Sequence, residues 1–186
     1  ALVARVEALE LGLARKDGGA AVLAAGERLS GVLGTVAALV HVEPGYETAV
    51  SAALGPLADA VAVGSVSRAV DAVTLLKTDD AGRASLLVGG AAAPERDAWP
   101  TLPAGARWAV DLVRAPDGLL GAVQVALARV AVVDSLEAAG ALVSSYADLV
   151  AVTREGDVLA AGVAHGGSAS APSLLEVQAA VDEARA

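Results

Sequence analysis

The sequence predicts an α/β protein of two related helix-and-strand lobes, with a helical stub at each end of the chain. Three observations favour this class. Helix-like and strand-like segments alternate through the middle of the 186 residues, as they do in α/β proteins. The second half of this middle repeats the order of the first half. Both ends carry apolar residues at heptad spacing.

The two ends are expected to be coiled-coil stubs, over residues 1–16 and 171–186. Apolar residues recur there at the three- and four-residue spacings of heptad positions a and d. They are Leu2, Val6, Leu9 and Leu13, and then Leu174, Val177, Val181 and Ala184. Ordinary amphipathic helices on a globular core are the alternative, because each run is short. Ser173 and Glu176 have the spacing of a capping box, which predicts a helix start.

The first half predicts a helix, a strand, a second helix and a second strand, over 46–54, 60–63, 66–76 and 84–88. Pro44 suits the first turn of the first helix, and Gly55-Pro56 would end that helix. The run Asp79-Asp80-Ala81-Gly82 is typical of a turn, here leading into the second strand.

The second half repeats this order over 122–127, 130–133, 136–143 and 149–153. Ser65 and Ser135 precede the second helix of each half and are 70 positions apart. Asp134 and Glu137 have the spacing of an Asp capping box for the later helix. The proline-containing stretch 89–105 predicts a loop between the lobes. The globular part is thus expected over 17–170, with a first lobe over 30–105 and a second over 106–170.

Composition limits the chemistry and the partners. The formal net charge of −9 argues against a strong, nonspecific grip on nucleic acid. Cysteine is absent, which excludes disulfides and thiolate sites and fits a cytoplasmic protein. Charge or glycine cuts every apolar stretch before the roughly 18 residues that a membrane helix needs, and no signal peptide is visible. Because Met is absent, we expect an internal piece of a larger protein.

Motifs for catalysis and cofactor binding are missing from the sequence. Gly162, Gly166 and Gly167 form G-x-x-x-G-G, which is neither a dinucleotide fingerprint nor a P-loop, since no lysine follows. His41 and His165 lie far apart without clustered carboxylates, so no metal site is expected. No G-x-S-x-G elbow and no carboxylate pair stands out. We therefore expect a non-catalytic region without a cofactor.

Several motifs occur in order along nearly the whole chain. They are Gly31-Val-Leu-Gly34-Thr-Val36, Pro44-Gly45-Tyr46-Glu47, Ala49-Val50, Ala52-Ala53-Leu54-Gly55, Ala60-Val61, Gly82-Arg83-Ala84, Val152-Thr153-Arg154-Glu155-Gly156-Asp157-Val158 and Gly166-Gly167-Ser168. In this combination the chain resembles the hinge domain of bacterial SMC (structural maintenance of chromosomes) proteins.

The resemblance implies the SMC hinge fold and a homodimer. In that family the hinge joins two antiparallel coiled-coil arms, and two hinges pair into a two-fold ring in which strand edges of one lobe meet those of the partner's other lobe. Carried onto this chain, the glycines expected at the interface are Gly82, Gly156, Gly162, Gly166 and Gly167. A residue without a Cβ allows close approach to a strand edge. For Gly156 a plain hairpin turn is an equal alternative.

The same resemblance implies that the parent protein is an ATPase. It would bind ATP in separate head domains and support chromosome condensation and segregation at the nucleoid in the cytoplasm. Family members that bind DNA through the hinge often carry lysines after G-G-S, whereas residues 169–173 are neutral here. Any DNA contact is therefore expected to be weak and to use basic residues near the coiled-coil stalk, which the two terminal stubs would form: Arg5, Arg15, Lys16, Arg154 and Arg185. Solvated coiled-coil flanks are the alternative for these side chains.

A second class of function stays open on the sequence alone. A small-molecule or anion-binding α/β domain would use the glycine loop before Ser173 to hold an anion at the N-terminus of the last helix.

Overall fold

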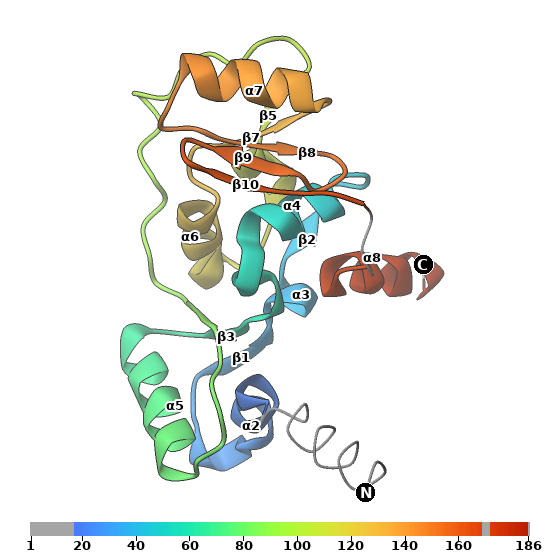
Figure 1. Cartoon of the computed structure of the whole chain (residues 1–186). Coiled ribbons are helices and arrows are strands. Elements are labelled where there is room, and N and C mark those ends of the chain that lie inside the picture. The colour runs from blue at the N-terminus through green and yellow to red at the C-terminus, as the bar shows by residue number, and fades with distance from the viewer. Residues whose placement is uncertain (1–16, 169–171, 186) are drawn as a thin grey trace, which may run out of the picture.

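The chain folds into five stacked layers, which can be followed from top to bottom in Figure 1. The structure is a computed structural model and describes residues 17–168 and 172–185. A helix covers the five-stranded sheet, a middle layer of helices follows, and below it lie the three-stranded sheet and two further helices. The predicted α/β class is confirmed. The predicted N-terminal stub, residues 1–16, lies outside the described residues.

The three-stranded sheet belongs to the first half of the chain. Its strands have the order β1 (Val32–Thr35), β3 (Val61–Val63) and β4 (Leu86–Val88). β1 is antiparallel to β3, and β3 is parallel to β4. The helices α2 (Gly18–Ala24) and α5 (Val66–Thr78) pack on its outer face, with the short η1 (Gly26–Arg28) beside them.

The five-stranded sheet belongs to the second half. Its order is β10 (Val163–His165), β9 (Val158–Ala160), β8 (Val150–Thr153), β7 (Val130–Val133) and β5 (Arg107–Trp108). Only β7 and β8 are parallel to each other. The helix α7 (Leu136–Ser145) covers the outer face of this sheet.

The middle layer fills the space between the two sheets. It contains α3 (Val36–Leu39), α4 (Glu47–Leu54), η2 (Gly55–Asp59), η3 (Ala109–Leu112), α6 (Asp117–Ala126) and the two-stranded pair of β2 (His41–Val42) with β6 (Val113–Arg114). The last helix, α8 (Leu174–Arg185), lies beside α3 and α4. A helix was expected here from the capping box, and this prediction is confirmed.

The internal repeat is real at the level of individual side chains. In the strands, Val61 and Ala131 occupy equivalent positions and both face the outer helices, whereas Ala62 and Val132 both face the central core. In the helices of the middle layer, three equivalent pairs are buried in that core: Ala49 with Ala122, Val50 with Val123, and Leu54 with Leu127. A repeated pattern of small and branched apolar residues therefore builds both halves.

Both outer helices start with the same cap. The hydroxyl of Ser65 accepts a hydrogen bond from the amide of Arg68, and Ser135 accepts one from the amide of Ala138. The predicted Asp134 capping box is wrong, because the serine next to it already occupies the N-cap position. Asp134 instead forms an ion pair with Arg154 at 3.2 Å.

The start of α4 also differs from the prediction. Pro44 is not in the first turn of a helix: Pro44 and Gly45 form a turn, and α4 begins at Glu47. Gly45 has φ = 89°, which is outside the helical region and favours glycine. At the other end Gly55, at φ = 56°, ends α4 as the sequence predicted.

The predicted loop 89–105 contains no helix or strand and runs along one side of the molecule from one lobe to the other. Its first residues pack backbone to backbone against α6. The Gly90 amide donates to the Gly118 carbonyl at 2.9 Å, and a Cβ on Gly121 would overlap the Ala91 carbonyl. Gly121 is therefore needed for this close packing, a role that the sequence analysis did not assign.

Candidate functional site

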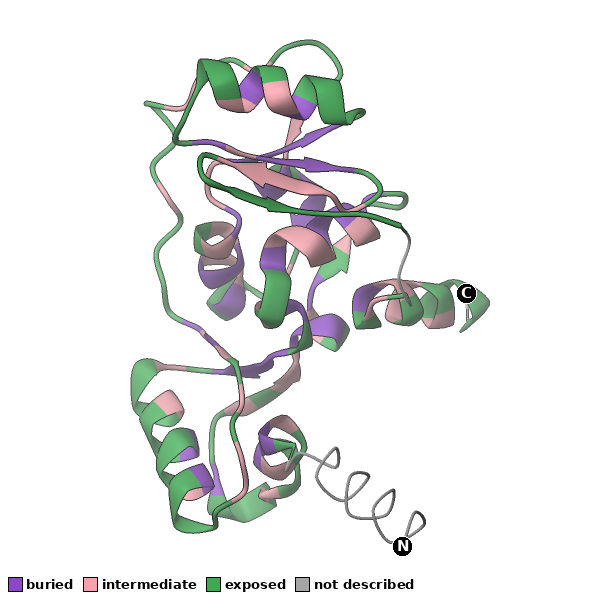
Figure 2. Ribbon diagram, in the orientation of Figure 1, coloured by how far each residue is buried: buried purple, intermediate pink, exposed green. Residues whose placement is uncertain are grey.

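The hairpin of β9 and β10 forms one free end of the larger sheet. Within the described part of the chain β10 pairs only with β9. All three of its residues are exposed, Val163 by 51%, and the strand is green throughout in Figure 2. Gly162, at φ = 83°, makes the two-residue turn together with Ala161. An edge of this kind leaves N–H and C=O groups available to another strand.

The glycine pair after β10 has a clear intrachain role. Gly167 donates its amide to Asp157 Oδ1 at 3.2 Å, and Thr153 Oγ1 donates to Asp157 Oδ2 at 3.0 Å. A Cβ on Gly166 would overlap the Asp157 carboxylate. The missing side chain at Gly166 therefore makes room for Asp157, which anchors the segment after β10 to the β8–β9 turn.

Gly156 lies in that β8–β9 turn. It has φ = 94°, and its amide donates to the Thr153 carbonyl at 3.0 Å, which is the geometry of the hairpin-turn alternative. A Cβ on Gly156 would come within 3.1 Å of Thr48 Cγ2, on α4. The turn thus also packs closely on the middle layer.

The smaller sheet has its own free edge at β4, which pairs only with β3 among the described strands. Gly82, at φ = 91°, stands in the turn before it. A groove beside the start of β4 is lined by residues of α5 and of this turn: Val73, Leu76, Lys77, Gly82, Arg83 and Ala84. Gly82 thus lies in the turn that precedes β4, and Gly162 in the turn that precedes β10.

The N-terminus of α8 is closed by its own side chains. The Ser173 amide donates to Glu176 Oε2 at 2.7 Å, and the Glu176 amide donates to Ser173 Oγ at 3.3 Å. Thr48 donates to the second oxygen of Glu176, and this bond, with those to Ser173, holds the pKa of Glu176 below its usual value. A carboxylate already lies where the alternative function would place an anion, so the geometry argues against that function.

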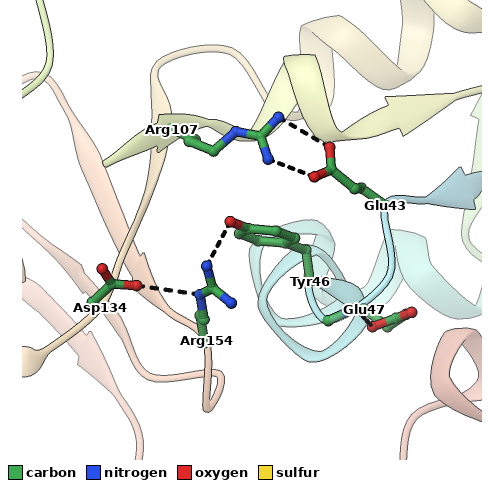
Figure 3. A network of polar contacts seen from close by, with 7 residues as sticks. Glu43, Tyr46, Glu47, Arg107, Asp134 and Arg154 are labelled. Carbon is green, nitrogen blue, oxygen red and sulfur yellow. Dashed lines mark hydrogen bonds and ion pairs between the residues drawn. The ribbon is translucent and has the colours of Figure 1, made fainter. Parts of the chain in front are cut away.

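A polar network joins the middle layer to the larger sheet (Figure 3). Tyr46 lies between two guanidinium groups, those of Arg107 at 5.4 Å and Arg154 at 4.3 Å from the ring centre. Arg154 donates to the Tyr46 hydroxyl at 2.7 Å, while Arg107 makes a bidentate pair with Glu43 at 2.6 and 3.0 Å. Sequence analysis missed this network, because its members lie far apart in the chain and share no motif.

The candidate DNA-contacting residues do not form a described patch. Arg154 is engaged by Asp134 and Tyr46. Arg185 lies in the last turn of α8 and is exposed. The other three candidates, Arg5, Arg15 and Lys16, lie outside the described residues.

The described ranges contain neither a metal-binding cluster nor a membrane-spanning helix. Residues 17–168 and 172–185 contain no group of three or more His, Asp or Glu side chains that could hold a metal ion. Within the same ranges no helix is both long and apolar enough to cross a bilayer. His41 and His165 lie on β2 and β10, which belong to different sheets.

Comparison with known proteins identifies the fold. The family described as SMC proteins Flexible Hinge Domain matches residues 29–143. The chain belongs to this SMC hinge family. The hinge is a non-catalytic domain of SMC proteins, in agreement with the prediction from the sequence.

The curated relatives are longer bacterial proteins named Chromosome partition protein Smc. That of Mycobacterium tuberculosis is 46% identical over 187 residues, and that of Mycobacterium leprae is 47% identical over 186 residues. The matches cover 99% and 100% of this chain but only 15% of each relative. The SMC hinge described here thus corresponds to a small part of those proteins.

Solved SMC hinges have the same fold. The Geobacillus stearothermophilus SMC hinge domain, solved as an asymmetric dimer, is 31% identical with a TM-score of 0.76, covering 90% of this chain and 71% of that one. The Pyrococcus furiosus SMC hinge domain is 25% identical with a TM-score of 0.67, covering 88% and 87%. The predicted SMC hinge fold is confirmed.

Proposed function

We propose that this SMC hinge joins two copies of its chain into a homodimer through the free edges of β4 and β10. The observation that carries the proposal is β10, a short strand that pairs on one edge and is exposed along its whole length. Pairing with the β4 edge of a second copy would satisfy its free N–H and C=O groups. Because each copy has one β4 edge and one β10 edge, two such junctions form under two-fold symmetry. The related Geobacillus hinge was solved as a dimer.

The glycines keep different roles within this proposal. Gly82 and Gly162 lie in turns next to the two edges, where a partner backbone would approach. Gly166 and Gly167 act on the interface through Asp157, because they fix the segment that follows β10. Gly156 lies in the turn between β8 and β9, which orients the β9–β10 hairpin.

For the whole protein, we infer an SMC ATPase of the bacterial nucleoid that supports chromosome condensation and segregation in the cytoplasm. Relatives named chromosome partition proteins support this inference. The stubs at 1–16 and 171–186 would be the roots of its two coiled-coil arms, and 17–170 its hinge. ATP would be bound by head domains, with no cofactor in the hinge. DNA contact near the stalk would be weak, given the net charge of −9 and the engagement of Arg154.

Substitution of Ala164 by proline tests the β10 edge directly. In a two-residue hairpin the pair next to the turn exchanges hydrogen bonds, so the next residue, Ala164, directs its N–H to the free edge. Ala164→Pro removes that donor without removing a β9–β10 bond. We expect the wild-type hinge to sediment at twice its 18.2 kDa chain mass. The dissociation constant of the Ala164→Pro dimer should be about tenfold or more higher than that of the wild type.

The matched control is Ala164→Ser, which keeps the N–H and should leave the dimer intact. A folded Ala164→Pro hinge that dimerises like the wild type would rule out pairing at β10. A wild-type hinge that stays monomeric over a hundredfold dilution range would rule out the dimer itself.

A further inference from the structure

The helix α5 carries an apolar stripe that nothing in the described chain covers. Val66, Val70 and Val73 follow each other at four and three residues, so they share one side of the helix. They are 71%, 58% and 41% exposed. A valine stripe of this kind on a surface helix is unusual, because the core side of α5 is supplied by other residues, Ala72 and Leu76.

The position of the stripe relates it to the free edge of β4. One side of α5 faces η1 and the end of α2, where Arg68 and Leu75 line a depression together with Arg28 and Leu29. The valines lie on the other side, and Val73 lines the groove at the turn that leads into β4. In Figure 2 the outward side of α5 is green, at the bottom of the molecule. The stripe therefore extends the β4 edge with side-chain surface.

Edge pairing alone offers little surface to a dimer. β4 and β10 have three residues each, whereas a stable interface buries about 800 Å² on each partner and involves roughly 20–30 residues a side. An apolar surface next to the paired strands must supply the remainder. The exposed faces of β10, including Val163, need such a cover as well.

We propose that the α5 stripe, Val66, Val70 and Val73, is part of the contact with a second copy of this chain and packs over the partner's β9–β10 hairpin. The inference rests on the proposed dimer, because β4 must be paired for the partner to come within reach of α5.

The test introduces a charge into the stripe. Burial of an unpaired carboxylate at an interface is strongly unfavourable, so Val66→Glu and Val70→Glu should each weaken dimerisation about tenfold or more by sedimentation or mass photometry. The control is Ser67→Glu, which places the same charge next to Val66 but about 100° around the helix, on the polar side. It should weaken the dimer less than about threefold.

The outcomes separate this inference from the proposed dimer. A stable wild-type dimer that Val66→Glu and Val70→Glu weaken no more than Ser67→Glu would overturn the α5 contact alone. A monomeric wild-type hinge would overturn both. Circular dichroism of the three variants should match the wild type, because all three positions are exposed, and this ensures that a loss of dimer is not a loss of fold.

Discussion

Thr48 connects three parts of the molecule through a single side chain. Its hydroxyl donates to Glu176, which caps α8, and its methyl group lies against the turn that contains Gly156. That turn continues into Asp157 and so to the segment after β10. The helix α8 and the proposed interface strand β10 are therefore linked by a few short contacts.

Replacement of Thr48 by valine should loosen α8 and raise the pKa of Glu176. The Thr48 hydrogen bond is the main cause of the lowered pKa of Glu176. Its stabilising effect is therefore complete above the unfolded-state pKa of 4.5. It is lost as the pH falls through the lower pKa of Glu176 in the folded state. We expect a loss of about 1 kcal/mol in the free energy of unfolding at pH 7, and a smaller loss at acid pH.

Carboxyl NMR titration of Glu176, with urea unfolding at several pH values, checks this expectation. Thr48→Ser keeps the donor and is the control. A Glu176 pKa that is unchanged in Thr48→Val would show that the bond from Thr48 does not stabilise the ionised cap.

At the scale of single elements, replacing a glycine by alanine should have opposite effects on the free energy of unfolding in two helices. A Cβ on Gly121 of α6 would overlap the backbone of Ala91, whereas Gly140 of α7 has open space around it. Gly121→Ala should lower the free energy of unfolding by about 1–3 kcal/mol. Gly140→Ala should raise it by up to about 1 kcal/mol, because alanine is the better helix former.

Urea unfolding at one fixed protein concentration measures both changes, since the stability of a dimer depends on concentration. If Gly121→Ala were neutral, the loop 89–105 would not be packed on α6 as described.

The elements that could be predicted are those with a local signal. Both copies of the repeat were predicted as strands followed by helices, with a serine before each of these helices, and the α8 start was predicted from a capping box. Six short strands, β1, β2, β5, β6, β9 and β10, were not expected, because runs of two to four residues carry too little periodicity to predict a strand. The helix α2 was missed as well, since its small glycine- and alanine-rich sequence has little hydrophobic pattern.

Within the candidate site, only the residues that the resemblance to SMC hinges implied could be predicted. The candidate interface glycines came from the resemblance. The clash of a Gly166 side chain with Asp157 and the position of Tyr46 between two arginines depend on how distant segments pack in three dimensions. Asp134 shows that a motif alone can mislead. The neighbouring Ser135 caps α7, and the Asp134 carboxylate instead pairs with Arg154.

At the scale of the whole molecule, the two larger sheets have four edge strands among the described residues: β1 and β4 of one sheet, and β5 and β10 of the other. The proposed dimer uses β4 and β10, where glycine turns and exposed valines gather. The sequence could not rank these edges, because an edge is defined by which strands pair in three dimensions.

Backbone hydrogen exchange of the wild-type hinge, compared well above and well below its dissociation concentration, tests this choice most directly. Amides at the free edges of β4 and β10 should be protected at the higher concentration and should exchange faster on dilution, while those of β1 and β5 stay unchanged. Protection that appears at β1 or β5 instead, in a hinge that dimerises, would contradict the proposed pairing.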